Sequence, residues 1–117
     1  MKEKKITVSC LIKRIESGER EKIRYRSWEL AQLFGVYEPA VIANVKAIIK
    51  TGFILPCADC AVRQVGNTLL PEEYNLELIV ALAFRLNSPA SLQFRKWIIE
   101  KISCKVNVFG VNYQMLN

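Results

Sequence analysis

The sequence of 117 residues contains no histidine and only eleven carboxylate side chains. Histidine is the side chain most often used as a general base, and it is the commonest metal ligand, because its imidazole titrates near neutral pH. The sequence also lacks a recognisable acidic pair, phosphate-binding loop or activated nucleophile. We therefore predict a protein that is not an enzyme, with no cofactor, no bound metal and no small-molecule substrate.

Long apolar runs and flexible segments are scarce as well. The longest uncharged apolar run, residues 78–84, is too short to span a bilayer, and there are only five glycines and four prolines. These features predict one compact domain with no membrane segment. Residues 2–5 are basic and precede an apolar stretch, but no small-residue cleavage site follows, so we expect a cytoplasmic protein.

The four cysteines are too dispersed to indicate a metal site. Cys57 and Cys60 have the spacing of zinc and redox motifs, yet a zinc site without histidine would also need both Cys10 and Cys104. A redox thiol would need a strand before Cys57 and a helix after it, and the surrounding sequence does not show that pattern. We expect reduced thiols in loops and core.

Positive charge is abundant at one end of the chain. The net charge is +6, and residues 1–26 carry nine lysines or arginines against four glutamates. A basic excess of this kind is typical of proteins that contact polyanions, and it is also common in solvated tails. We interpret residues 1–26 as a basic N-terminal arm or hairpin, with extended segments at residues 6–15 and 23–28.

Residues 27–52 predict two helices joined by a tight turn. Ser27 suits the N-cap of a short helix that Gly35 ends, and Pro39 suits the first turn of a second helix that ends near Thr51 and Gly52. Counted from Ser27, the small and apolar residues fall at the positions that a helix-turn-helix motif requires. These residues are Leu30, Ala31, Phe34, Gly35, Val36 and Val41.

The remaining segments complete the predicted fold. Residues 61–65 and 68–70, joined by Gly66 and Asn67, predict a hairpin that would serve as a wing. Asn75 and Ser88 predict the N-caps of two further helices, the first of them central, and a tail follows from Lys105. The predicted fold class is α+β: a small winged helix-turn-helix domain over residues 27–104, with a β-hairpin wing, two further C-terminal helices and a tail over residues 105–117.

Two parts of the sequence resemble a known family. Residues 27–54 form one part, and the other comprises the stretches 74–79, 85–88 and 93–97, which contain Tyr-Asn-Leu, Arg-x-Asn-Ser and Gln-Phe-Arg-x-Trp. Together they resemble the N-terminal domain of the RhuM family of virulence-associated proteins over roughly residues 25–103. Residues 94–97 are also similar to the N-terminal domains of phage antirepressors and baculovirus repeated proteins. The resemblance implies a winged-helix, DNA-binding protein of mobile-element or phage origin.

These observations predict a transcriptional regulator that binds double-stranded DNA as a homodimer. The second helix of the motif would enter the major groove and the hairpin would follow the backbone, while pairing would double the contacts. We expect Tyr37 and Asn44 nearest the bases and Lys46 and Lys50 at phosphates. Arg63 and Gln64 would contact DNA from the hairpin.

A second hypothesis remains open for the same helix. Glu38 at its start would repel phosphate, and its small residues Ala40, Ala43 and Ala47 offer no hydrogen bonds to bases. The alternative is a non-enzymatic protein-interaction or dimerisation module that has lost base-specific DNA reading, with these alanines packed on another chain.

Overall fold

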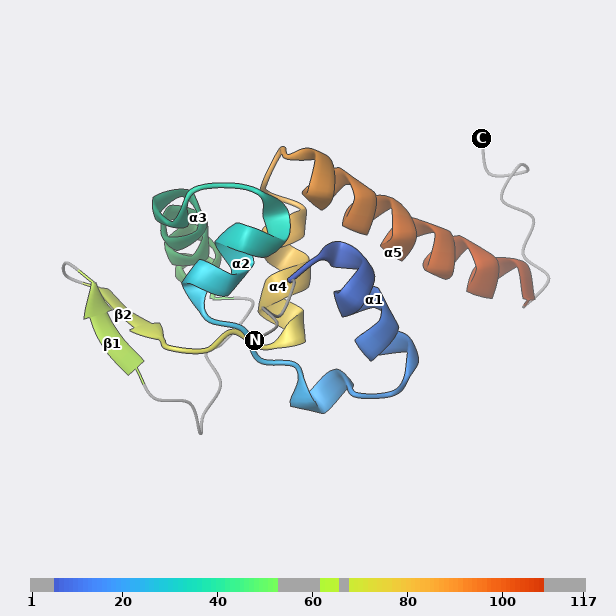
Figure 1. Cartoon of the computed structure of the whole chain (residues 1–117), viewed down its shortest axis with the longest axis horizontal. Coiled ribbons are helices and arrows are strands. Elements are labelled where there is room, and N and C mark those ends of the chain that lie inside the picture. Colours follow the sequence, from blue (N-terminus) through green and yellow to red (C-terminus); the bar gives the residue numbers. More distant parts are fainter. Residues whose placement is uncertain (1–5, 53–61, 66–67, 109–117) are drawn as a thin grey trace, which may run out of the picture.

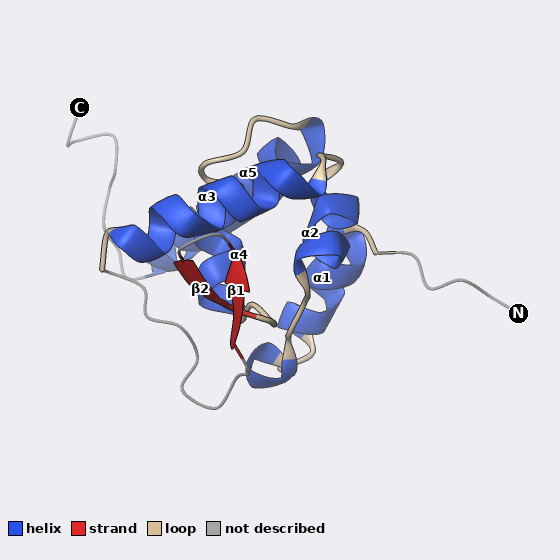
Figure 2. Ribbon diagram, turned by 90° about the vertical axis from the view of Figure 1, so that its left-hand side faces the viewer, coloured by secondary structure: helices blue, strands red, loops and turns tan. Residues whose placement is uncertain are grey.

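The structure is a computed structural model that describes residues 6–52, 62–65 and 68–108, and the side chains of residues 62–69 and 104–108 lie outside that description. Helices make up most of it, as Figures 1 and 2 show. In chain order the elements are α1 (Val8–Glu16), the 3-10 helix η1 (Arg20–Lys22), α2 (Ser27–Phe34), α3 (Glu38–Lys50), β1 (Val62–Val65), β2 (Thr68–Pro71), α4 (Leu76–Ala83) and α5 (Pro89–Val108).

The predicted α+β winged fold is wrong, because the described chain is mostly helical. The strands have four residues each and pair antiparallel with one another, Val65 opposite Thr68. This short ribbon projects from the helical body in Figure 1, and within the described residues neither strand packs broadly on a helix. Among the residues that the structure describes, no wing beside the second helix of the motif is therefore evident. Leu70 and Pro71, at the end of β2, are buried.

The predicted hairpin between residues 6 and 28 is also wrong, because residues 8–16 form helix α1. Val8 and Leu11 are buried, and Ile12 and Ile15 pack beside them, so the apolar side chains recur at helical spacing. The Thr7 hydroxyl caps the helix by accepting a hydrogen bond from the Cys10 backbone N–H at 3.2 Å. Burying this stripe against α5 outweighs the irregular alternation that suggested a strand.

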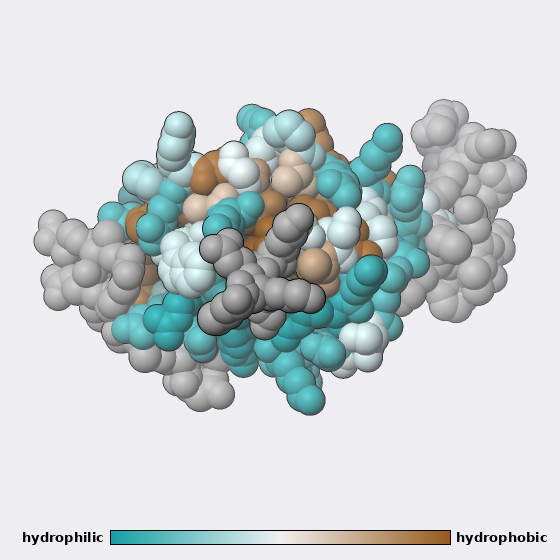
Figure 3. All heavy atoms as spheres, viewed as in Figure 1, coloured by the Kyte–Doolittle hydropathy of each residue, from teal (hydrophilic) through white to brown (hydrophobic). Residues whose placement is uncertain are grey.

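Helix α4 is central to the core. Leu78, Ile79, Leu82 and Ala83 are buried, and α4 packs against both α3 and α5. The predicted N-cap at Asn75 is confirmed, because its Oδ1 accepts a hydrogen bond from the Leu78 N–H at 3.1 Å. In the face drawn in Figure 3, hydrophilic residues occupy most of the periphery and hydrophobic surface shows nearer the middle.

Helix α5 joins this core through aromatic contacts. Phe94 is fully buried beside Phe34 of α2, with 6.4 Å between the ring centroids, and it stacks on Trp97 at 6.1 Å. The helix continues to Val108, so the predicted tail from Lys105 begins as helix, and residues 109–117 lie outside the described residues. In the described part of the chain, no helix combines the length and apolar character needed to cross a membrane.

Two buried serines build the turn between α4 and α5. The Ser88 hydroxyl accepts a hydrogen bond from the Ser91 N–H at 3.1 Å, and the Ser91 hydroxyl accepts one from the Ser88 N–H at 3.0 Å. The Ser91 hydroxyl also lies 3.0 Å from the Leu86 carbonyl, to which it donates. The predicted cap at Ser88 is thus confirmed, and this reciprocal pairing fixes the direction in which α5 leaves the core.

The turn between α2 and α3 allows a direct test of the fold. Gly35 has a φ of +67°, and a Cβ added there would meet nothing within 4 Å, so substitution changes backbone strain alone. We expect Gly35→Ala to lower the free energy of unfolding by about 1–2 kcal/mol, as measured by urea denaturation. Gly35→Asn, the matched control, should lose less because asparagine tolerates the left-handed region. Equal stability of Gly35→Ala and the parent protein would contradict this geometry.

Candidate nucleic-acid interface

Helices α2 and α3 form the two-helix arrangement that the sequence predicts. Gly35 ends α2 in the left-handed conformation, and α3 begins at Glu38 after a short turn. Leu30, Phe34 and Val41 are fully buried between the helices and the rest of the core. Hydrophobic burial therefore fixes the angle between α2 and α3 and leaves the opposite side of α3 outside.

The N-termini of α2 and α3 are tied together by a hydrogen bond. The predicted N-cap at Ser27 is wrong. Arg26 is the N-cap of α2, and Ser27 is the first helical residue. The buried Ser27 hydroxyl instead donates to the Glu38 carboxylate, which is half-buried at the start of α3. Glu38 is thus engaged with α2 near the positive ends of two helix dipoles, where negative charge is favoured.

The outward side of α3 carries small residues and two lysines. Val41, Val45 and Ile48 face the core, and the residues one half-turn away are exposed or half-buried. We name these residues the α3 face: Pro39, Ala43, Lys46, Ala47 and Lys50. Lys46 and Lys50 lie one helical turn apart, and Ala43 and Ala47 beside them leave the helix surface low enough for close approach by a partner. This face is basic and nearly free of bulky side chains.

Tyr37 stands at the entrance to α3. It is the N-cap of the helix, makes no capping hydrogen bond with its side chain and is 86% exposed. Its ring therefore projects into solvent at the end of the α3 face nearest α2. An exposed tyrosine presents an apolar ring and a hydroxyl that can both donate and accept hydrogen bonds.

Asn44 lies on a flank of α3 rather than on the α3 face. It is half-buried, and its Nδ2 donates to the Ala40 carbonyl at 2.8 Å. Its Oδ1 accepts a hydrogen bond from Nε of Arg85 at 3.1 Å. The structure therefore does not group Asn44 with Lys46 and Lys50, and an interaction of its amide with a base would have to replace these two bonds.

Two basic residues that were not predicted from the sequence as site residues also lie in this region. Arg85 follows α4 and is exposed, and its hydrogen bond with Asn44 places it beside α3. Arg26 is exposed next to Ser27, and therefore near the start of α3. The excess of basic residues in the segment 1–26 is the sequence pattern that could have indicated a role for Arg26. The contact of Arg85 spans 41 residues and no local pattern reveals it.

The other predicted positions are only partly described. Arg63 and Gln64 lie in β1, opposite Leu70 and Leu69, and their side chains fall outside the described part. Cys57 and Cys60 also lie outside it. Cys10 is an exposed free thiol, and no group of three or more potential metal ligands occurs among the residues that the structure describes.

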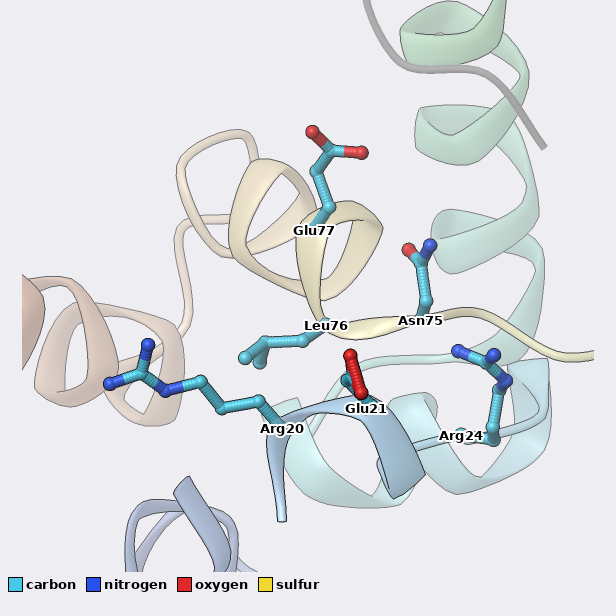
Figure 4. Close-up of a pocket in the computed structure, with 6 residues that line it drawn as sticks. All are labelled: Arg20, Glu21, Arg24, Asn75, Leu76 and Glu77. Carbon is cyan, nitrogen blue, oxygen red and sulfur yellow. The ribbon is translucent and has the colours of Figure 1, made fainter. Parts of the chain in front are cut away.

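A separate pocket of about 460 Å³ lies between η1 and the start of α4 (Figure 4). Arg24 lies beside Asn75 in this view, whereas Arg20 and Glu77 extend away from each other. Two arginines and two glutamates line the pocket, so positive charge is not concentrated there. The Asn75 side chain is already used as a helix cap. The α3 face therefore remains the stronger candidate site.

Comparison with protein-family models, with curated proteins and with solved structures found no match. The resemblance to the RhuM family stays a prediction from the sequence.

The contact between Asn44 and Arg85 can be measured by a double-mutant cycle. We expect Asn44→Ala and Arg85→Ala to be less than additive in urea unfolding, with a coupling of about 0.5–1 kcal/mol, because either change removes the same exposed hydrogen bond. Lys46→Ala combined with Arg85→Ala is the matched control and should be additive, since Lys46 lies across the helix from Asn44. Additivity of the Asn44 and Arg85 changes would contradict the contact.

Proposed function

We propose that this protein binds double-stranded DNA by placing α3 in the major groove. The observation that carries the proposal is the α3 face, which combines two lysines with small residues on a helix held by a helix-turn-helix arrangement. The net charge of +6 supports the same proposal, because it attracts the chain to a polyanion at long range. The resemblance to the RhuM family points the same way and suggests a role in transcription regulation.

The shape of α3 suits a groove. The major groove of B-DNA is about 12 Å wide and accepts an α-helix, and two phosphate strands border it. Lys46 and Lys50 lie on one side of α3, while Asn44 and its partner Arg85 lie on the other, since residues two apart are separated by about 200° around a helix. Basic groups on both sides of α3 are therefore placed to reach both phosphate strands. Ala43 and Ala47 lie between these groups and allow the helix backbone to approach the floor of the groove.

Phosphate contact comes first and base reading second in this proposal. Lysine and arginine contacts to phosphates position the protein, and groups that reach base edges provide selectivity. Tyr37 is the exposed residue placed to reach a base from the N-terminal end of α3. Because Asn44 is engaged within the protein, Tyr37 is the better candidate for base contact, and Arg26 is placed to contact a phosphate beside it.

The engagement of Glu38 by Ser27 favours DNA over the alternative of a pure interaction module. A carboxylate directed into the groove would repel phosphate, but this one is half-buried against α2. A protein-interaction surface built on Ala40, Ala43 and Ala47 would show little salt dependence, whereas phosphate binding weakens steeply as salt rises.

The proposal predicts the effect of removing two positive charges from the α3 face. We expect Lys46→Ala/Lys50→Ala to weaken binding to a random 20-base-pair duplex. Because each phosphate contact contributes about one unit, the slope of log affinity against log salt should fall by about two. Fluorescence anisotropy between about 50 and 200 mM salt measures both quantities.

The matched control removes the same charge elsewhere. Lys96 and Lys101 are both exposed on α5, so Lys96→Ala/Lys101→Ala should leave the salt slope closer to that of the parent protein. If the two double variants weaken binding equally, only net charge matters and α3 is not the contact surface. If the parent protein does not bind at 50 mM salt, the interaction-module hypothesis is preferred.

A further inference from the structure

We propose that Asn44 is a positioning residue for DNA binding, whose amide holds the Arg85 guanidinium beside α3 in the orientation that contacts a phosphate. This role rests on the proposed function, and it gives Asn44 a part other than base contact. The two side chains are joined by a hydrogen bond in which Nε of Arg85 donates to Oδ1 of Asn44 over 3.1 Å. Asn44 lies in the middle of α3, and Arg85 follows the C-cap of α4.

The orientation of the Asn44 amide is fixed within the chain. Its Nδ2 donates to the Ala40 carbonyl, one helical turn earlier, over 2.8 Å, and the side chain is half-buried. The amide oxygen accepts hydrogen bonds and the NH2 group donates them, so turning the amide over would set donor against donor and oxygen against oxygen. Asn44 therefore presents its acceptor atom to Arg85.

Arg85 is held at both ends of its side chain. Its backbone N–H donates to the Leu82 carbonyl over 3.0 Å, and α4 packs against α3, so the backbone of Arg85 is fixed at the core. An unrestrained arginine side chain has several rotatable bonds and loses much of this freedom when it is immobilised. The bond from Asn44 restricts these bonds at the far end and orders the guanidinium before DNA arrives.

The rest of the guanidinium is left for a partner. Arg85 is exposed, and in the part of the chain that the structure describes its side chain makes no second hydrogen bond and no salt bridge. Nε is occupied by Asn44, and the two Nη atoms carry the remaining four N–H donors of the group. These donors form a planar fork that matches two oxygens of a phosphate.

This arrangement makes one flank of α3 a phosphate contact without sequence preference. An asparagine that reads adenine uses both its amide oxygen and its amide nitrogen, and both atoms of Asn44 are already bonded within the chain. Contacts to phosphate fix the position of the protein on DNA and carry no sequence information directly. Asn44 thus supports affinity through Arg85, and base contact remains with Tyr37.

Replacing Asn44 tests the positioning role against a base-reading role. We expect Asn44→Ala to weaken binding about three- to tenfold, because Arg85 must then be ordered at the moment of binding. Fluorescence anisotropy with two 20-base-pair duplexes, one of A·T pairs and one of G·C pairs, should show the same loss for both. Gln93→Ala, which removes an exposed amide on α5, is the matched control and should bind like the parent protein. A loss confined to the A·T duplex would overturn the positioning role.

A double-mutant cycle on DNA affinity shows whether Asn44 acts through Arg85. Arg85→Ala should lower the slope of log affinity against log salt by about one. Asn44→Ala/Arg85→Ala should bind as weakly as Arg85→Ala alone, because Asn44 then has no guanidinium to orient. Alanine suits a helix interior, so the helical circular-dichroism signal should be retained in all variants. An equal loss from Asn44→Ala with and without Arg85 would contradict the inference.

The positioning role and the proposed function can fail separately. Lys46→Ala/Lys50→Ala is measured on the same duplexes. If that double variant lowers the salt slope while Arg85→Ala and Asn44→Ala bind like the parent protein, α3 remains the DNA-binding helix and the positioning role is wrong. If the parent protein binds neither duplex at about 50 mM salt, the proposed function is wrong and the positioning role falls with it.

Discussion

The burial of α4 is the constraint on which the rest of the structure depends. This helix of eight residues contains a single charged residue, Glu77, and its apolar side chains point in nearly every direction. Such a helix is stable in water only when other helices enclose it. Helices α3 and α5 both pack against it, and each therefore commits one side to the core. The opposite side of α3, which carries the α3 face, is consequently left outside the core.

The exposed sides of α3 and α5 differ in chemistry. The α3 face is small and basic, with Lys46 and Lys50, and it fits a negatively charged groove. Leu92, Ile99 and Ile102 on α5 are by contrast apolar and more than half exposed. The basic face and these apolar residues therefore lie on different helices.

The sequence predicted helix boundaries correctly where capping and turn residues mark them. It did not predict the features that depend on packing between distant segments. Gly35, Asn75 and Ser88 marked helix boundaries correctly, because each carries a specific backbone or capping role. The helix at residues 8–16 was missed because charged residues interrupt its apolar spacing, and only burial against α5 reveals it. The prediction of a winged fold was wrong because a hairpin pattern indicates that two strands pair but does not indicate which helix they pack against. The Ser27–Glu38 and Asn44–Arg85 bonds join separate elements and have no local signature.

Mapping which backbone amides respond to DNA tests the role of α3 most directly. In ¹H–¹⁵N correlation spectra of the labelled protein titrated with a 20-base-pair duplex, the largest shift changes should fall between Tyr37 and Lys50 and at Arg26 and Arg85. The amides of Leu92, Ile99 and Ile102 on α5 should change little. Shift changes concentrated on α5, or spread evenly over the surface, would contradict the central claim that α3 is the DNA-binding helix.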